Sequence, residues 1–222
     1  MDANSAANAG ALRENLVFSY RLYGKPDNLC RNAMVLLHGS GVDETTMAPL
    51  GTEIAPDAAL IAVRGRVSQE DGWRWFERIT PTRFGQQSIK AEAGAFADFI
   101  PKLAEAHGLD LSRTTFLGYS NGANLISSVM LLHPGLIERA VLLRAMPVLD
   151  EVPPTDLSAA RVLVISGAAD VTYGPFAQPL VALLSGHGAE VGAYSVAHGH
   201  EFGAEDVKII RDWLAPPPVP VA

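Results

Sequence analysis

An alcohol, a carboxylate and two imidazoles each follow a run of strand-forming residues in this sequence. Ser120 lies within Gly-Tyr-Ser-Asn-Gly, and Asp170 comes shortly after a second apolar run. His198 and His200 follow the last such run. A serine hydroxyl attacks a carbonyl carbon only if a base accepts its proton, and a neutral histidine with a pKa of about 6.5 suits that role. A carboxylate bonded to the other ring nitrogen fixes the tautomer that is required. These residue types are the set that acyl transfer needs.

Ser120 stands where a strand is expected to turn directly into a helix. A turn this tight holds its central residue in a backbone conformation that costs about 1–3 kcal/mol, and such strain is concentrated at functional sites. Gly118 and Gly122 flank the turn, and we expect a Cβ atom at either position to clash. Ser120 is therefore the predicted nucleophile.

The carbonyl oxygen that is attacked acquires negative charge and needs hydrogen-bond donors. The backbone N–H of Asn121 lies at the predicted helix start beside the nucleophile, and the Gly-rich loop at residues 39–41 can present a second donor. Each such donor is worth about 2.7–4 kcal/mol in the transition state.

Other residues compete for the roles of acid and base. Rival carboxylates lie on the loop at residues 150–156, but only Asp170 closely follows a convincing strand end. His198 and His200 both lie after the last predicted strand, so their positions alone leave the choice of base open.

Short runs with strand character alternate with helical segments along the chain. Several of these runs are apolar at consecutive positions, as strands covered on both faces require. The alternation predicts an α/β fold with a doubly wound, mostly parallel sheet and ligands bound at the carboxyl ends of the strands. The predicted strands are residues 16–23, 33–39, 59–65, 114–120, 139–145, 161–167 and 190–196. The predicted helices are residues 86–108, 121–133, 175–184 and 204–214.

The length of the chain fits one domain. With 222 residues and 48% hydrophobic content, it can bury one sizeable core but is short for two. We expect the domain to span residues 14–215, between a flexible tail at residues 1–13 and a Pro-rich tail at residues 216–222.

The motif at residues 118–122 lies on a predicted strand–turn–helix, and an acid and then a histidine follow it along the chain. In this arrangement the sequence resembles the α/β-hydrolase superfamily. The stretches LLHGSG, GYSNGAN, GAAD and GHEF resemble in particular the bacterial phospholipase/carboxylesterase family, relatives of the acyl-protein thioesterases. The resemblance covers residues 16–214. No insertion is long enough to form a lipase-like cap domain.

The resemblance also implies roles for individual residues. Ser120 corresponds to the nucleophile, Asp170 to the acid and His200 to the base, since His200 is the histidine of the family's Gly-His motif. The family's oxyanion donors correspond to the N–H groups of Ser40 and Asn121.

The aromatic stretch DGWRWFERI follows a predicted strand and has no place in that set of roles. We expect Trp73, Trp75 and Phe76 to reach the carboxyl edge of the sheet and to form one wall of the ester pocket. A role as core anchors fits the same pattern equally well.

The composition argues against several classes of partner. The net charge is −7, with 17 Lys and Arg and no basic run, which disfavours nucleic acid and anionic membranes. No apolar stretch approaches the roughly 20 residues of a membrane span, and the first residues lack the features of a signal peptide. The single cysteine, Cys30, is compatible with a reducing compartment and has no base nearby in the sequence. We therefore expect a cytoplasmic protein.

The pair His198 and His200 could be half of a metal site, but zinc requires three or four ligands and no further cluster accompanies them. We predict no metal and no cofactor. The predicted function is hydrolysis of small to medium carboxylic esters through an acyl-serine intermediate, with a small-molecule ester as partner. A thioesterase, a lysophospholipase and, in another class, a small-molecule receptor are the alternatives, and a homodimer is compatible with the sequence.

Overall fold

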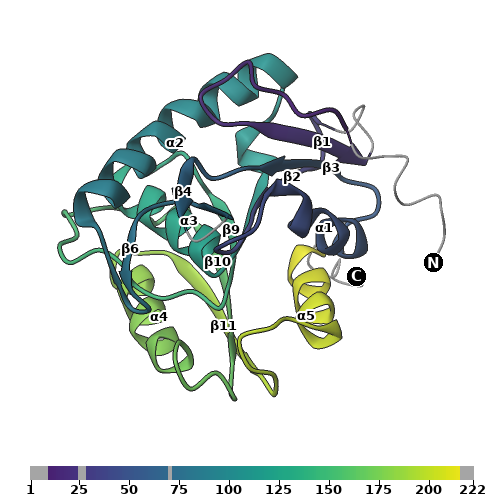
Figure 1. Ribbon diagram of the computed structural model, residues 1–222. Coiled ribbons are helices and arrows are strands. Elements are labelled where there is room, and N and C mark those ends of the chain that lie inside the picture. The colour runs from purple at the N-terminus through teal and green to yellow at the C-terminus, as the bar shows by residue number, and fades with distance from the viewer. Residues whose placement is uncertain (1–9, 25–28, 70–71, 216–222) are drawn as a thin grey trace.

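The computed structural model describes residues 10–24, 29–69 and 72–215. A seven-stranded sheet crosses the molecule in the order β1-β3-β2-β8-β9-β10-β11 (Figure 1). Strand β1 is antiparallel to β3, and the other neighbours are parallel. The strands are β1 (Tyr20–Gly24), β2 (Ala33–Leu37), β3 (Ala59–Val63), β8 (Thr115–Tyr119), β9 (Arg139–Leu143), β10 (Arg161–Gly167) and β11 (Glu190–Val196).

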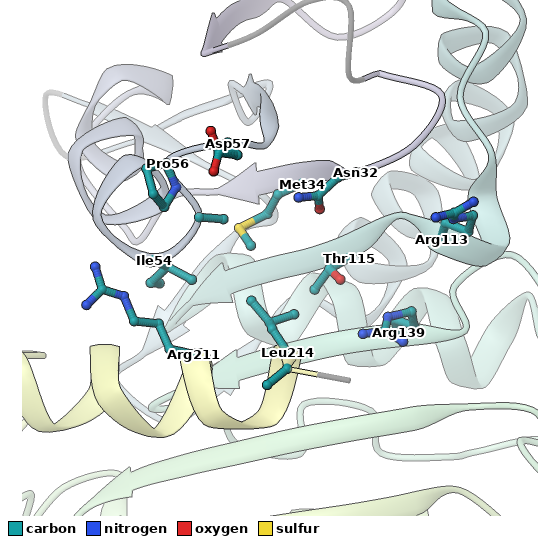
Figure 2. Close-up of a pocket in the computed structure, with 12 residues that line it drawn as sticks. Asn32, Met34, Ile54, Pro56, Asp57, Arg113, Thr115, Arg139, Arg211 and Leu214 are labelled. Atoms are coloured by element: carbon teal, nitrogen blue, oxygen red, sulfur yellow. The ribbon is translucent and has the colours of Figure 1, made fainter. Parts of the chain in front are cut away.

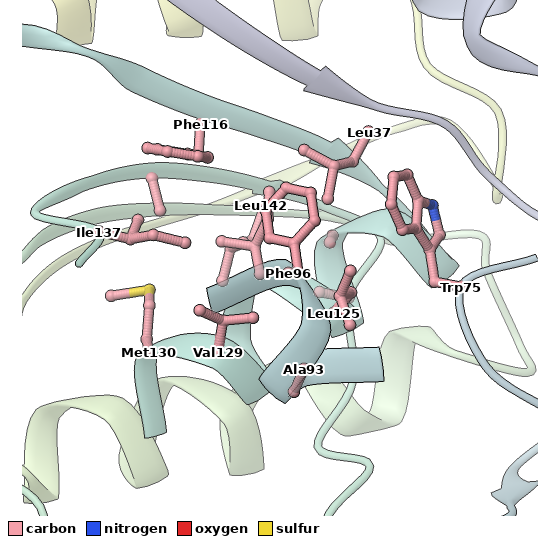
Figure 3. Packing of buried hydrophobic residues seen from close by; sticks show 14 of the residues in the cluster. Leu37, Trp75, Ala93, Phe96, Phe116, Leu125, Val129, Met130, Ile137 and Leu142 are labelled. Carbon is pink, nitrogen blue, oxygen red and sulfur yellow. The ribbon is translucent and has the colours of Figure 1, made fainter. Parts of the chain in front are cut away.

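Helices cover both faces of this sheet because its central strands are apolar on both sides. Every residue of β2 and β3 is buried. One face packs against α2 (Gln86–His107), α3 (Asn121–Leu132) and α4 (Ala177–Gly186), and the other against α1 (Ala48–Ile54) and α5 (Ala204–Leu214). The larger core cluster brings Phe96 of α2 and Leu125 of α3 together with Phe116 of β8 (Figure 3).

All seven predicted strands are confirmed as members of this sheet, and the four predicted helices are also present. The first strand is shorter than predicted, because Arg13 and Tyr20 exchange backbone hydrogen bonds of 2.8 and 3.0 Å and the chain between them forms a loop. Gly108 ends α2 in the left-handed conformation, with φ of 65°.

The structure adds elements that the sequence pattern did not indicate. Helix α1 has only seven residues. Two short hairpins lie between β3 and α2: β4 (Val67–Gln69) with β5 (Gly72–Arg74), and β6 (Arg78–Thr80) with β7 (Arg83–Phe84). The 3-10 helices are η3 (Glu44–Met47), η4 (Leu111–Arg113) and η5 (Gly174–Phe176).

The two predicted tails fall mostly outside the described residues. Within the described part, Gly10 contacts β1 through its carbonyl oxygen, which accepts a hydrogen bond of 3.0 Å from Nη1 of Arg21. No helix in the described ranges is both long enough and apolar enough to cross a membrane.

Candidate active site

The turn between β8 and α3 holds Ser120 in a strained conformation. Its φ and ψ are 51° and −111°, in a region that residues with a Cβ atom rarely occupy. A Cβ atom on Gly118 would lie 2.5 Å from the backbone N of Ala123, and one on Gly122 would lie 2.5 Å from the carbonyl oxygen of Leu37. The predicted clashes at both glycines are thus confirmed. The turn is possible only because the two residues lack side chains.

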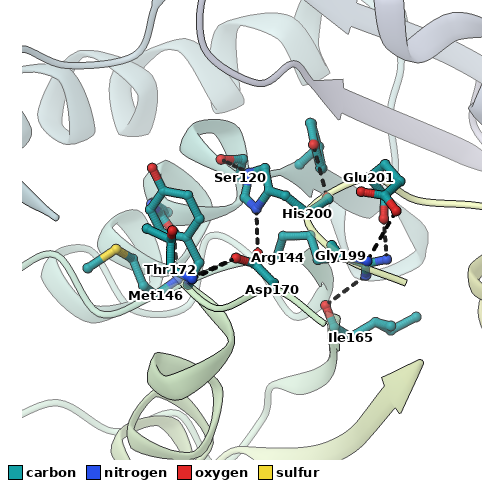
Figure 4. A network of polar contacts seen from close by, with 12 residues as sticks. Ser120, Arg144, Met146, Ile165, Asp170, Thr172, Gly199, His200 and Glu201 are labelled. Carbon is teal, nitrogen blue, oxygen red and sulfur yellow. Dashed lines mark hydrogen bonds and ion pairs between the residues drawn. The ribbon is translucent and has the colours of Figure 1, made fainter. Parts of the chain in front are cut away.

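The structure brings Ser120, His200 and Asp170 together at the carboxyl edge of the sheet (Figure 4). Nε2 of His200 lies 3.0 Å from Oγ of Ser120, and Nδ1 of the same ring lies 2.6 Å from Oδ2 of Asp170. These residues follow β11, β8 and β10, so three separate strand ends build one continuous chain of hydrogen bonds. This is the order of groups that activates a serine hydroxyl.

The competing residues lie elsewhere. His198 is exposed, and its ring lies against Gly203, where a Cβ atom would meet Nε2 at 3.2 Å. Asp156 is bonded to the backbone N of Ser158 at 2.8 Å, within its own loop. The structure therefore places His200 and Asp170, and not these rivals, against the serine.

Asp170 is held as a carboxylate. Its residue is 7% exposed, and Oδ1 accepts hydrogen bonds from the backbone N–H groups of Tyr173 at 2.9 Å and Thr172 at 3.2 Å. Burial raises the pKa of Asp170, but the N–H of Tyr173 and the ring of His200 lower it by more, so the net shift is downward. Asp170 remains ionised at neutral pH and can stabilise an imidazolium.

Two aromatic rings lie beside the imidazole of His200. The centroid of the Tyr173 ring is 4.6 Å from that of His200, and the Tyr119 ring is 5.4 Å away. The hydroxyl of Tyr119 also donates a hydrogen bond of 3.0 Å to the carbonyl oxygen of His200. These contacts limit rotation of the imidazole away from the serine.

Arg144 fixes the loop that carries His200, a function that the sequence analysis missed. Nε donates to the carbonyl oxygen of Gly199 at 3.0 Å and Nη2 to that of Glu201 at 2.6 Å, on either side of the histidine (Figure 4). The guanidinium also pairs with both carboxylate oxygens of Asp206, at 2.7 and 3.0 Å, and both side chains are fully buried. The signal in the sequence was a charged residue directly after the apolar residues 140–143 of β9 (Arg139–Leu143).

The loop at residues 39–41 is held against the serine turn. A Cβ atom on Gly39 would lie 2.8 Å from Cδ1 of Tyr119. The buried ring of His38 supports the loop, because Nε2 accepts from the N–H of Gly65 at 2.9 Å and Nδ1 therefore carries the proton shared with the carbonyl oxygen of Gly39 at 2.6 Å. Burial lowers the pKa of His38, in agreement with a neutral ring.

A small cavity opens beside the nucleophile and has about 20 Å³ of free volume. Both predicted oxyanion residues border it together with the serine. Its lining consists of Ser40, Arg74, Arg78, Pro81, Phe84, Ser120, Asn121, Asn124, Arg144 and Tyr173.

The predicted aromatic wall is wrong for Trp75 and Phe76, which are fully buried in the main core. Trp75 packs edge-on against Phe96 at 5.7 Å and donates from Nε1 to the carbonyl oxygen of His38 at 2.8 Å. Trp73 is partly buried beneath the guanidinium of Arg64 and is also absent from the cavity lining. Large aromatic side chains gain most from complete burial, so the segment turns these rings inward.

A larger cavity, of about 320 Å³, lies at the opposite edge of the sheet (Figure 2). It borders the amino ends of β2 and β8 and the end of α5, with Met34, Thr115 and Leu214 in its lining. Ligands of doubly wound folds bind at the carboxyl ends of the strands, so this cavity is not the substrate site.

Groups that could support other chemistry are not assembled here. Cys30 is exposed and lies just before β2 begins, so it is at the opposite end of the sheet's strands from the serine turn. In the described parts of the chain, no cluster of three or more His, Cys, Asp or Glu side chains could hold a metal ion.

The chain shares its fold and sequence with known proteins over almost its whole length. No family model matches it. A carboxylesterase from Mesorhizobium loti is 60% identical, with a TM-score of 0.91 over 95% of this chain and 100% of that one. The Bacillus cereus carboxylesterase shares the fold, with a TM-score of 0.84 at 23% identity over 90% and 94% of the two chains. The "Putative hydrolase MhqD" of Bacillus subtilis (strain 168) is 29% identical over 183 residues, which are 82% of this chain and 92% of the relative.

Proposed function

Because the chain belongs to the phospholipase/carboxylesterase family of the α/β-hydrolase superfamily and is a carboxylesterase, we propose that Ser120, His200 and Asp170 hydrolyse the ester through a covalent acyl-serine intermediate. The observation that carries this proposal is the hydrogen-bond chain from Oγ of Ser120 through the imidazole to the buried carboxylate. Among the described residues, Ser120 is the serine whose hydroxyl lies within hydrogen-bond distance of a histidine nitrogen.

The first half of the reaction forms the acyl-enzyme. Oγ of Ser120 attacks the ester carbon while its proton passes to Nε2 of His200, and the carbonyl oxygen becomes an oxyanion. Asp170 stabilises the imidazolium that results. The C–O bond to the alcohol then breaks, and the same proton passes from Nε2 to the departing oxygen.

The second half repeats these steps with water. Nε2 of His200 removes a proton from the water as its oxygen attacks the acyl carbon, and Ser120 leaves with that proton. We propose that the N–H groups of Ser40 and Asn121 donate to the oxyanion in both halves, since both residues border the cavity beside the nucleophile. Such donors are present before the reaction starts and need no reorganisation.

The size of the site favours small and medium esters. The cavity beside Ser120 has about 20 Å³ of free volume. A cavity needs roughly 10–15 Å³ on a comparable measure to hold one water, so a long acyl chain does not fit here without rearrangement. We therefore propose that short acyl groups are hydrolysed faster than long-chain lipids.

The test is sustained turnover of a short-chain chromogenic ester by the wild-type protein and the Ser120→Ala variant. We expect many equivalents of alcohol per protein from the wild type and none above background from the variant, with an unchanged circular dichroism spectrum. Release of only one equivalent by the wild type would instead indicate a receptor with a residual nucleophile. A parallel thioester of the same acyl chain measures whether the leaving atom alters the preference.

A further inference from the structure

The proposed oxyanion donors belong to two separate segments of the chain. The N–H of Ser40 lies in the loop after β2, and the N–H of Asn121 belongs to the first residue of α3. A Cβ atom on Gly122 would lie 2.6 Å from the carbonyl oxygen of His38, so the two segments approach each other closely. Donors stabilise an oxyanion when they are already aimed at its position, so a residue that joins these segments bears on catalysis.

Trp75 makes a hydrogen bond to each of the two segments. Its indole Nε1 donates to the carbonyl oxygen of His38 at 2.8 Å, two residues before Ser40. Its backbone N–H donates to Oδ1 of Asn121, also at 2.8 Å. Trp75 is fully buried, so both bonds form away from bulk water, where a hydrogen bond is stronger. One residue therefore connects the two halves of the proposed oxyanion hole.

The strand β5, just before Trp75, holds the loop on the other side of Ser40. The backbone N–H of Gly41 donates to the carbonyl oxygen of Trp73 at 3.0 Å, and the N–H of Trp73 donates to that of Val42 at 3.3 Å. A Cβ atom on Gly72 would lie 2.4 Å from the carbonyl carbon of Gly41, so there is no space for a side chain between the two segments. The loop is thus fixed both before and after the proposed donor.

The indole of Trp75 is itself fixed by three neighbouring rings. Its ring centroid lies 5.2 Å from that of His38, 5.7 Å from that of Phe96 and 5.9 Å from that of Phe18 (Figure 3). These contacts give the indole N–H one direction. Packing in the core requires a large aromatic ring but no N–H donor, so the bond to the carbonyl oxygen of His38 is a feature that packing alone does not explain.

We propose that Trp75 is a positioning residue of the oxyanion hole, which sets the spacing between the N–H groups of Ser40 and Asn121. Because both N–H groups are assigned to the oxyanion, this role rests on the proposed function. Trp75 is absent from the lining of the cavity beside Ser120 and acts through the segments that it holds. A shift of either segment moves one donor relative to the other, which weakens binding of the tetrahedral transition state more than binding of the planar ester.

The experiment replaces Trp75 by phenylalanine, which keeps a buried aromatic ring and removes the indole donor. We expect kcat for a short-chain chromogenic ester to fall by about tenfold to 100-fold, while KM changes by less than about threefold. Rates are normalised to the number of sites that a fluorophosphonate labels, so that unfolded protein is not counted. Trp213→Phe is the matched control, because it makes the same change in the core cluster on the other face of the sheet, and it should keep kcat within about twofold.

A transition-state analogue distinguishes positioning from a purely structural role. Butylboronic acid binds Oγ of Ser120 through its boron, which becomes tetrahedral and places an oxygen at the oxyanion position. Its inhibition constant should rise in Trp75→Phe by about the factor by which kcat falls. The fall of kcat/KM at low pH should keep its midpoint, because His200 and its partners are unchanged.

A second variant tests the other hydrogen bond and does not depend on the folding of Trp75→Phe. Asn121→Ala keeps the backbone N–H at this position and removes the oxygen that accepts from Trp75, so kcat and the affinity for butylboronic acid should again fall together. Retention of kcat within about twofold by either variant, or a fall in kcat with unchanged boronate affinity, would overturn the proposal. Equal binding of butylboronic acid by the wild type and by Ser120→Ala would refute the acyl-serine mechanism, and this proposal with it.

Discussion

Replacement of Arg144 by methionine should weaken both the fold and the catalytic geometry, for two separable reasons. The guanidinium is fully buried and neutralises Asp206, which is also fully buried. Removal of one member of such a pair leaves an uncompensated charge, at a cost of about 3–5 kcal/mol. The same substitution removes the donors to the carbonyl oxygens of Gly199 and Glu201, at 3.0 and 2.6 Å, which flank His200.

The two effects can be measured independently. Urea unfolding should show the full loss of stability for Arg144→Met, and most of it should return in the double variant Arg144→Met/Asp206→Asn, where no charge is left unpaired. The activity should not return, because the loop at His200 still lacks its donors. A displacement of a catalytic group by about 1 Å lowers kcat by up to about 100-fold. Arg161→Met is the control, since its ion pair with Glu190 is exposed at 3.7 Å and contributes at most about 1 kcal/mol.

Two results would refute this reasoning. If Arg144→Met keeps kcat/KM within about twofold of the wild type, the loop does not depend on the arginine. If the double variant recovers stability and activity together, Arg144 acts through charge balance alone and not by holding the carbonyl groups.

His200→Ala should lower kcat/KM by about 1,000-fold or more, whereas His198→Ala should have a mild effect, and the reverse order of severity would move the base to His198. Gly122→Ala should lower the free energy of unfolding by about 1–3 kcal/mol or more, because its Cβ would meet a carbonyl oxygen at 2.5 Å. Gly186→Ala is the control, since the space around that position is open, and equal melting temperatures of the two variants would contradict the prediction. Because the pKa of Asp170 is lowered in the folded state, its ionisation stabilises the fold fully above about pH 4, and this contribution is lost as the pH falls further. The difference in unfolding free energy between the wild type and Asp170→Asn should therefore shrink in acid. A difference that grows in acid would show that the sign is wrong.

The strands and the serine turn could be predicted because their signals are local. Consecutive apolar residues define β2, β3 and β10, whichever partner each strand finds in the sheet. The clash at Gly118 follows from the tightness of one turn. The residues at the strand ends could be predicted to meet because the carboxyl ends of parallel strands share one edge.

The features that were missed depend on contacts between distant segments. The pairing of Arg144 with Asp206 joins positions 62 residues apart, and neither residue has a local pattern that identifies the other. The burial of Trp75 was equally hidden, because an aromatic residue after a strand can turn toward the core or toward a pocket. In the structure, contacts with Phe18 and with Phe96 of α2, both distant in the sequence, place the ring in the core.

The most direct test of the proposed mechanism is to map the covalent adduct that a fluorophosphonate forms with the wild-type protein. Peptide mass spectrometry should find one adduct per chain, on Ser120, and its formation should be strongly slowed in His200→Ala. An adduct on another residue, such as Ser40 or Cys30, or continued ester turnover by a protein whose Ser120 is fully modified, would contradict the account.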